Sequence, residues 1–190
     1  MWLTPVGPRA APSHTDEELM LRSAAGDRAA FDDLVTRHRE RVTALARRYV
    51  RAQDDADDVA QEAFVRLYRS RQRYRPDAKF STFLYRIVVN LCIELSRKQK
   101  RRPSVDAEEA DPSGPRSGEP ERVVLQRDLV GRVKNALQRL PDKQRTAVVL
   151  CRYEGRSYRE IAEVLGCTEK AVEAMLYRAR LTLSAELDEG

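Results

Sequence analysis

Five carboxylates crowd one short stretch of the chain and are the first candidates for chemistry. The stretch reads DDADDVAQEAFVRLYRS, and its acidic residues are Asp54, Asp55, Asp57, Asp58 and Glu62. Clustered carboxylates can hold a hard metal ion. However, no histidine lies nearby, and carboxylates at a helix start need no metal because they stabilise its free backbone amides. We therefore interpret the cluster as an exposed acidic helix face for a protein partner. A metal-dependent nuclease is the alternative built on the same residues.

The remaining reactive residue types do not form a catalytic or cofactor pattern. His14 and His38 lie far apart, and no phosphate-binding loop, zinc pattern or Ser/His/Asp set is visible. Cys92, Cys151 and Cys167 are widely spaced without a CxxC pair, which argues against a zinc site or a disulfide framework. We interpret the cysteines as small core residues, with redox sensing as the alternative. The sequence predicts no enzyme, no cofactor and no small-molecule substrate.

A second segment, RYRPDAKFSTFLYRIVVNLCIELSRKQKRR, interleaves aromatic and basic side chains. Its aromatic residues include Tyr74, Phe80, Phe83 and Tyr85, and its bases include Arg75, Lys79, Arg86, Lys98 and Arg101. Aromatic platforms among positive charges suit the unstacked bases of single-stranded nucleic acid. Core packing must still claim some of these rings, and we expect Phe83 to be buried.

A third segment, SYREIAEVLGCTEKAVEAMLYRARLTL, is typical of a helix-turn-helix. Ser157 and Glu160 have the spacing of a capping box, Gly166 suits a left-handed turn, and Thr168 can cap a second helix. The apolar residues that supply the buried faces are Ile161, Ala162, Leu165, Val172, Met175 and Leu176. An ordinary helical hairpin is the alternative.

In a helix-turn-helix the N-terminal end of the second helix enters the major groove of DNA. The residues then exposed near bases would be Thr168, Glu169, Lys170 and Glu173. The residues available to hold phosphates are Arg156, Arg159, Arg178 and Arg180.

The elements that must position these residues are helices. Apolar residues recur at helical spacing from Phe31 to Tyr49, a second helix is predicted from Asp54 or Asp55, and a third runs from about Ser81 to RKQKRR. Residues 103–120 hold four prolines, two glycines and mostly acidic charge, which predicts a linker. Residues 123–140 and the stretch DKQRTAVVLCRY predict further helices. The expected fold is therefore all-α, with two small helical domains joined by a flexible Pro/Gly/acidic linker, the C-terminal one a helix-turn-helix.

The charge balance of the sequence and its lack of long apolar runs are consistent with an anionic partner inside the cell. Lys plus Arg number 35 against 30 for Asp plus Glu, and a mild basic excess weakly favours nucleic acid. No apolar run approaches the ~20 residues of a membrane span. The first residues, MWLTPVGPRAAPSHT, lack an apolar signal core. We expect a cytoplasmic protein with a disordered leader.

Three segments together resemble the bacterial sigma factors of the extracytoplasmic-function group of the sigma-70 family. They are DDADDVAQEAFVRLY, KFSTFLYRIVVNLCIELSRKQKRR and LPDKQRTAVVLCRYEGRSYREIAEVLGCTEKAVEAMLYRAR. With the linker they cover almost everything after the leader. The resemblance implies a leader over 1–15, sigma region 2 over 16–102, a linker over 103–120 that threads toward the RNA exit path, and sigma region 4 over 121–190.

The resemblance also implies a function, partners and roles by position. The chain would bind core RNA polymerase through its β′ clamp helices and β flap, recognise and melt promoter DNA, and be held inactive by an anti-sigma factor. The positions that match the clamp-docking helix are Asp57, Asp58, Gln61, Glu62, Phe64 and Arg66. Those that match the minus-ten reader are Tyr74, Arg75, Lys79 and Phe80, which would capture a flipped base, and Arg86, Asn90, Arg97, Lys98 and Arg101. Those that match the minus-thirty-five reader are Arg156, Arg159, Thr168, Glu169, Lys170, Glu173, Arg178 and Arg180.

Some positions depart from the family pattern. Phe83 stands where Trp is common, Glu94 where Asp is common, and Glu173 and Met175 where bases are frequent. An acidic side chain can accept from a cytosine amino group but repels phosphate, so the family's usual upstream sequence is not assumed. The rival hypothesis is a stand-alone helix-turn-helix regulator, which needs a dimer interface, and no heptad seam is present.

Overall fold

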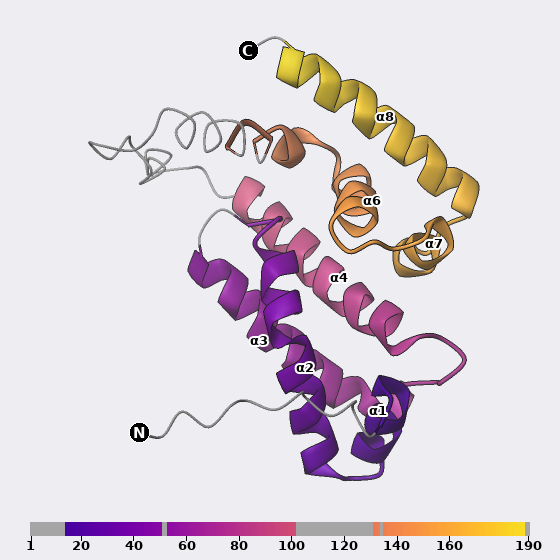
Figure 1. The fold of residues 1–190 in the computed structure, drawn as a ribbon. Coiled ribbons are helices and arrows are strands. Elements are labelled where there is room, and N and C mark those ends of the chain that lie inside the picture. Colours follow the sequence, from indigo (N-terminus) through magenta and orange to yellow (C-terminus); the bar gives the residue numbers. More distant parts are fainter. Residues whose placement is uncertain (1–13, 51–52, 102–130, 134, 189–190) are drawn as a thin grey trace, which may run out of the picture.

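The computed structural model describes residues 14–50, 53–101, 131–133 and 135–188, and within these ranges it is helical without strands (Figure 1). The all-α prediction is confirmed. The leader up to residue 13, the linker 103–120 and the first part (123–130) of the predicted helix over 123–140 lie outside the described residues, whereas residues 131–133 and 135–139 are helical as predicted. Helix α1 spans Asp16–Ala24, α2 Arg28–Ala46, α3 Gln53–Ser70 and α4 Phe80–Arg101, with a 3₁₀ turn η1 at Arg71–Arg73; α6 spans Asp142–Arg152, α7 Tyr158–Leu165 and α8 Glu169–Asp188. None of the described helices is long and apolar enough to cross a membrane.

The first domain packs α1 to α4 around a shared core. Helix α3 packs against both α2 and α4, and the residues fully buried between them include Leu34, Leu45, Leu67 and Leu84. The predicted starts of the second and third helices are confirmed to within a residue or two, because Asp54 and Asp55 lie in the first turn of α3 and α4 begins at Phe80.

Helix α1 is an element that the sequence analysis did not predict. Thr15 caps it in a capping box with Glu18, and the side chains of its own residues Leu19 and Met20 are fully buried. A carboxylate oxygen of Glu17 accepts a hydrogen bond of 2.8 Å from the backbone N–H of Phe80. Helix α1 therefore fixes the point at which α4 begins, because a carboxylate at a helix N-terminus satisfies a free amide and the helix dipole.

The second domain contains the predicted helix-turn-helix. Ser157 and Glu160 form the capping box of α7, and Gly166 ends that helix in the left-handed conformation at φ 63°. The hydroxyl of Thr168 accepts a hydrogen bond of 3.2 Å from the N–H of Ala171 at the start of α8. Ile161 and Val172 are fully buried between the two helices. All of these local predictions are confirmed.

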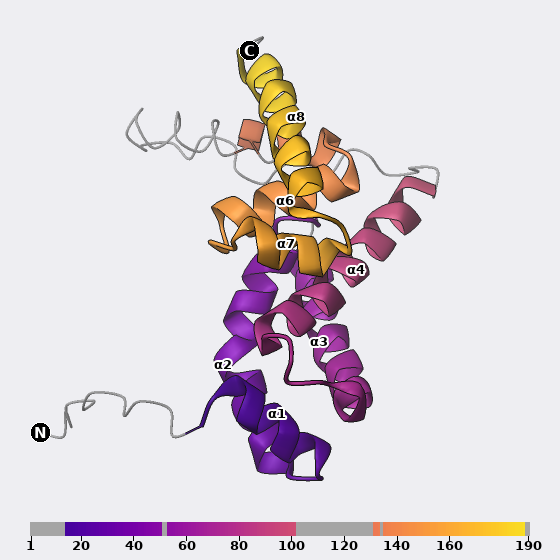
Figure 2. The ribbon, with the colours of Figure 1, turned by 90° about the vertical axis from the view of Figure 1, so that its right-hand side faces the viewer.

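The two domains pack directly on one another. Helix α7 contacts α4, and Figure 2 shows α7 lying against α4. Buried residues of the second domain, such as Leu150 and Ile161, belong to the same apolar cluster as Leu84 and Val88 of α4. The interface is therefore continuous with the core of the first domain.

Candidate protein and nucleic-acid interfaces

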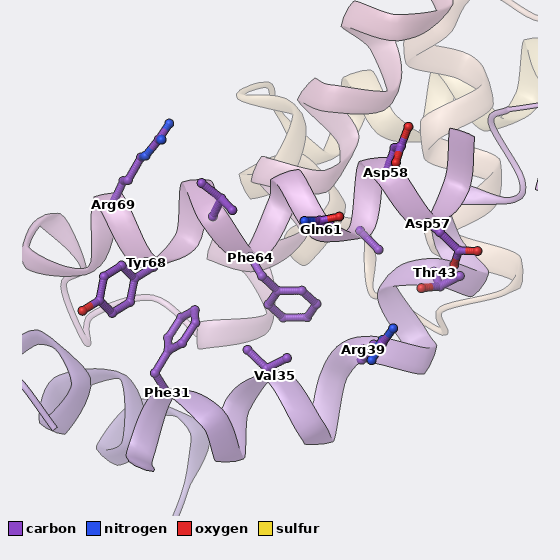
Figure 3. Close-up of a pocket in the computed structure, with 12 residues that line it drawn as sticks. Phe31, Val35, Arg39, Thr43, Asp57, Asp58, Gln61, Phe64, Tyr68 and Arg69 are labelled. Carbon is purple, nitrogen blue, oxygen red and sulfur yellow. The ribbon is translucent and has the colours of Figure 1, made fainter. Parts of the chain in front are cut away.

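A groove with a largely apolar wall lies between α2 and α3 (Figure 3). Its volume is about 540 Å³, and its apolar wall includes Phe31 and Val35 of α2 with Phe64 and Tyr68 of α3. The rings of Phe31 and Tyr68 meet edge to face, with centroids 4.9 Å apart. Spacing of four residues places each pair on one side of its own helix, so the two helices present a shared apolar trough.

The groove gathers four of the six residues predicted to dock on polymerase. Asp57, Asp58, Gln61 and Phe64 line it. Asp57 and Asp58 lie at one end, where Arg39 of α2 also lines the groove, and Arg69 lies at the other end (Figure 3). The acidic side chains are exposed, whereas Phe64 is buried. The arrangement offers an apolar floor with charged ends, which is suited to an amphipathic helix of a partner protein.

The other two predicted docking residues have a different environment. The guanidinium of Arg66 pairs with Glu62 at 2.9 Å and with Glu94 of α4 at 3.1 Å. The hydrogen bonds from Arg66 to Glu94 and Glu62 raise the pKa of Arg66. Arg66 therefore ties α3 to α4 through Glu94, and Glu62 holds Arg66 from the same helix; neither Glu62 nor Arg66 lines the groove.

Two of the residues predicted to capture a flipped base are core residues. Phe80 is fully buried and Tyr74 is 4% exposed. The Tyr74 hydroxyl donates to the Ala78 carbonyl at 3.1 Å, and its ring packs edge to face on Phe83 at 5.4 Å. Neither ring offers a free face to a nucleic-acid base in this structure. Their packing instead shapes the loop between η1 and α4, which exposes Arg75 and Lys79. Phe83, expected to be buried, is half-buried against the core.

Helix α4 presents the rest of the predicted minus-ten reader on one side. Arg86, Asn90 and Arg97 recur at helical spacing and are exposed, as is Lys98. The side chain of Arg101 lies outside the described residues. Polar and basic groups in one row suit a DNA strand, because bases supply hydrogen-bond partners and phosphates supply negative charge.

Helix α8 exposes most of the predicted minus-thirty-five reader. The exposed residues of this predicted set are Thr168, which precedes α8, and Glu169, Lys170, Glu173, Arg178 and Arg180 on the helix itself. Arg159 is 79% exposed and pairs with Glu163 at 3.4 Å. Arg156 is separated from this set, because its guanidinium is only 16% exposed and donates to Ser81 of α4 at 3.2 Å.

A hollow of about 720 Å³ lies beside this face, between α6 and α8. Lys170, Glu173 and Arg180 line it together with Arg152, Tyr158 and Tyr177. Its charged residues are three bases against one acid, on a wall that is otherwise largely apolar and includes Val148, Leu176 and Leu183. It extends the basic character of the α8 face toward α6.

The structure offers no metal centre within its described ranges, where no three His, Cys, Asp or Glu side chains gather as ligands. The described cysteines are free thiols. Burial raises the pKa of Cys92 to about 12, so this thiol stays protonated and packs as a small core residue. Cys151 and Cys167 are half-buried.

Several residues of these interfaces were not predicted as functional. Phe31, Val35 and Tyr68 complete the groove. The sequence signal for them was that Phe31 and Val35 lie four residues apart on one predicted helix, and that Phe64 and Tyr68 flank the buried side of the next predicted helix. Glu154 is a buried acid between the domains, and no local pattern marks it. Its partners Arg41 and Tyr85 lie 113 and 69 residues away in the chain.

Comparison with known proteins identifies the family. The sequence model of Sigma-70 region 2 matches residues 22–102, and that of Sigma-70, region 4, matches residues 131–183. The ECF RNA polymerase sigma factor SigM of Mycobacterium tuberculosis is 38% identical over 170 residues, which cover 90% of this chain and 83% of that protein. The chain belongs to the extracytoplasmic-function sigma factors. This membership favours a promoter-recognition subunit of RNA polymerase over a stand-alone regulator.

Solved structures support the same assignment. The structure of CnrH in complex with the cytosolic domain of CnrY superposes on this sigma factor with a TM-score of 0.70, at 32% identity, covering 92% of this chain and 97% of that one. The sigma factor RpoE in complex with the anti-sigma factor NepR from Bartonella quintana has a TM-score of 0.64 at 22% identity, covering 83% of this chain and 96% of that one. The second likeness is one of fold.

Proposed function

We propose that this sigma factor docks on the β′ clamp helices of core RNA polymerase through the groove between α2 and α3. The observation that carries the proposal is the apolar trough with Asp57 and Asp58 at one end. An apolar floor supplies affinity through burial, and charged ends fix the register and orientation of a helical partner. Glu62 and Arg66 support the groove indirectly by holding α3 on α4.

We propose that the two DNA readers lie on α4 and α8. The loop residues Arg75 and Lys79 with the exposed row on α4 would hold the melted minus-ten strand. The N-terminal half of α8 would enter the major groove at the minus-thirty-five element, as the second helix of a helix-turn-helix does. Tyr74 and Phe80 act in this scheme as the packed support of the loop. Region 4 would also meet the β flap.

Two weak readers on one chain act together through effective concentration. Once α8 holds duplex DNA, the minus-ten reader meets its strand as an intramolecular event, and each reader alone can remain weak. Unstacking a base costs only a few kcal/mol, which contacts along α4 can offset. The chemistry of RNA synthesis belongs to the polymerase, so no catalytic group is required of the sigma factor. Its place of action is then the cytoplasm, where the polymerase is, and an anti-sigma factor is the expected inhibitor.

A charge reversal at the groove tests the docking proposal. Asp58→Lys places a cation at the end of the groove that holds Asp57 and Asp58, and we expect it to abolish co-elution with core polymerase when no DNA is present. The matched control is Asp33→Lys on α2, because Asp33 is exposed on a side of that helix turned away from Phe31 and Val35. The control should co-elute like the parent chain. Unchanged co-elution of Asp58→Lys would refute the proposal.

A further inference from the structure

We propose that Glu173 of α8 selects cytosine at one position of the upstream DNA element. The inference rests on the minus-thirty-five role proposed above for α8, and it names a base that this reader prefers. Its basis is the environment of one carboxylate, which is exposed on the outer side of the helix and has no partner among the described residues.

The outer side of α8 is a short row of exposed residues at helical spacing. The row consists of Lys170, Glu173, Ala174 and Tyr177, which stand at positions i, i+3, i+4 and i+7 and therefore share one side of the helix. The opposite side is anchored in the domain, because Val172 is fully buried. In a helix-turn-helix such a row meets the edges of base pairs in the major groove.

Most other carboxylates of the second domain are held by a base. These ion pairs are Glu154 with Arg41, Glu160 with Lys79, Glu163 with Arg159 and Glu186 with Arg139. Within the described ranges Glu173 makes no ion pair and no side-chain hydrogen bond, although Lys170 and Arg180 line the same hollow. Its charge is therefore available to a ligand.

Helix stability does not account for the position of Glu173. Glu169 is another unpaired acid of this part of the chain, but it lies in the first turn of α8, where a carboxylate stabilises the free amides and the positive end of the helix dipole. Glu173 lies one turn further along, where this effect has faded. Beside DNA its charge also repels phosphates. A base that donates a hydrogen bond is the group that offsets this cost.

The chemistry of a carboxylate decides which base that is. A carboxylate only accepts hydrogen bonds. In the major groove cytosine presents an amino group, which is a donor, whereas guanine presents two acceptors and thymine presents one. Adenine presents a donor directly beside an acceptor, and that acceptor repels the second carboxylate oxygen. Glu173 therefore matches cytosine and discriminates against the other bases by repulsion.

The neighbours of Glu173 in the row fit a cytosine paired with guanine. The ammonium of Lys170 can donate to the two acceptors of that guanine. Ala174 is short and exposed, so it leaves room for a base edge beside the carboxylate. Lys170 and Glu173 thus offer a donor and an acceptor to the two bases of one pair.

Selection from duplex DNA of random sequence tests the proposal. Core RNA polymerase loaded with the full-length sigma factor captures DNA, and the captured pool is sequenced. The parent should enrich an upstream element with a cytosine at one position. Glu173→Gln should move the preference at that position alone to adenine, because an amide both donates and accepts. The matched control is Glu186→Gln at the opposite end of α8, which should keep the parent's pattern.

Two fluorescein-labelled duplexes that differ only at this base pair measure the size of the effect. By anisotropy, polymerase loaded with the parent should bind the cytosine duplex about tenfold more tightly than the adenine duplex. Glu173→Gln should reverse that order, and Glu173→Ala should bind both duplexes alike, because a methyl group neither donates nor accepts. The circular dichroism spectrum of each variant should stay that of the parent, since position 173 is exposed.

An upstream element without a cytosine position, or an unchanged cytosine preference in Glu173→Gln, would overturn the proposal. Equal tightening of Glu173→Gln on both duplexes would also overturn it, because the carboxylate would then act only by repelling phosphates. A failure of the proposed function has a different result. Polymerase loaded with the parent chain would then enrich no upstream element at all.

Discussion

At the scale of single residues, the rings of Tyr74 and Phe80 show how one residue type serves two purposes. An aromatic ring between bases in the sequence suits stacking on DNA, yet an aromatic ring is also the largest contribution to a small core. The residue pattern allowed both purposes, and the family resemblance favoured base capture for both rings. Burial of both rings assigns them to the core.

Substitution of Phe80 tests that assignment. Phe80→Leu keeps an apolar side chain and should lower the free energy of unfolding by about 1 kcal/mol, whereas Phe80→Ala leaves a cavity and should cost about 3–5 kcal/mol. Urea titration measures both. With core polymerase, Phe80→Leu should still open promoter DNA, as read by permanganate reactivity of unpaired thymines. A stable Phe80→Leu protein that fails to open promoters would mean that the ring stacks on a base.

Glu160 gives the folded chain a defined response to acid. The hydrogen bond from Lys79, followed by that from the Ser157 backbone, lowers the pKa of Glu160 from 4.5 to about 2, and Arg156 lies 3.5 Å away. A lowered carboxyl pKa means that the ionised form stabilises the folded state. This stabilisation is present above pH 4.5 and is lost as the pH falls toward 2. Since Lys79 is largely exposed, salt should weaken the effect.

The variant Glu160→Gln isolates this response. Glutamine can keep the capping hydrogen bond to Ser157 but cannot ionise. Between about pH 6 and about pH 3 the parent should therefore lose more unfolding free energy than Glu160→Gln does. Urea titrations at the two pH values measure the difference. Equal losses would show that Glu160 contributes nothing to the acid response.

At the scale of elements, the helix-turn-helix was predictable because its determinants are local. The Ser157 capping box, Gly166 and Thr168 each act within four residues of themselves, so the sequence displays them directly. Helix α1 has an equally local signal in Thr15 and Glu18, but the helix is short and begins directly after the predicted leader. Its role at the start of α4 depends on Glu17 and Phe80, which are 63 residues apart.

Gly166 provides the element-scale prediction. A Cβ at this position meets nothing within 4 Å, so only the positive φ opposes a side chain. Gly166→Ala should lower the unfolding free energy by about 1 kcal/mol. The matched control is Gly131→Ala, which also meets nothing within 4 Å but lies in helical backbone, where alanine is favoured. Thermal unfolding should show a loss for the first and none for the second. Equal behaviour of the two variants would contradict the role given to the turn.

At the scale of the whole molecule, the sequence predicted two helical domains and their order but could not predict how they pack. Periodicity identifies the apolar side of each helix, and it cannot say which distant element covers that side. Arg41 and Glu154 illustrate the limit, since an exposed-looking arginine and an acid in a turn become partners across 113 residues of sequence. The groove between α2 and α3 is intermediate, because four of its residues were predicted to dock on polymerase, whereas Phe31, Val35 and Tyr68 became part of the site only when the structure brought them together.

The function proposed for this chain is to give core RNA polymerase a promoter preference. The most direct measurement is transcription in vitro on genomic DNA by core polymerase with and without the sigma factor, with every RNA 5′ end mapped. We expect added sigma factor to create new start sites that share two upstream sequence elements, and Asp58→Lys to abolish them while Asp33→Lys does not. If no new start sites appear although the chain binds duplex DNA by itself, the central claim is contradicted and the chain acts as a stand-alone regulator.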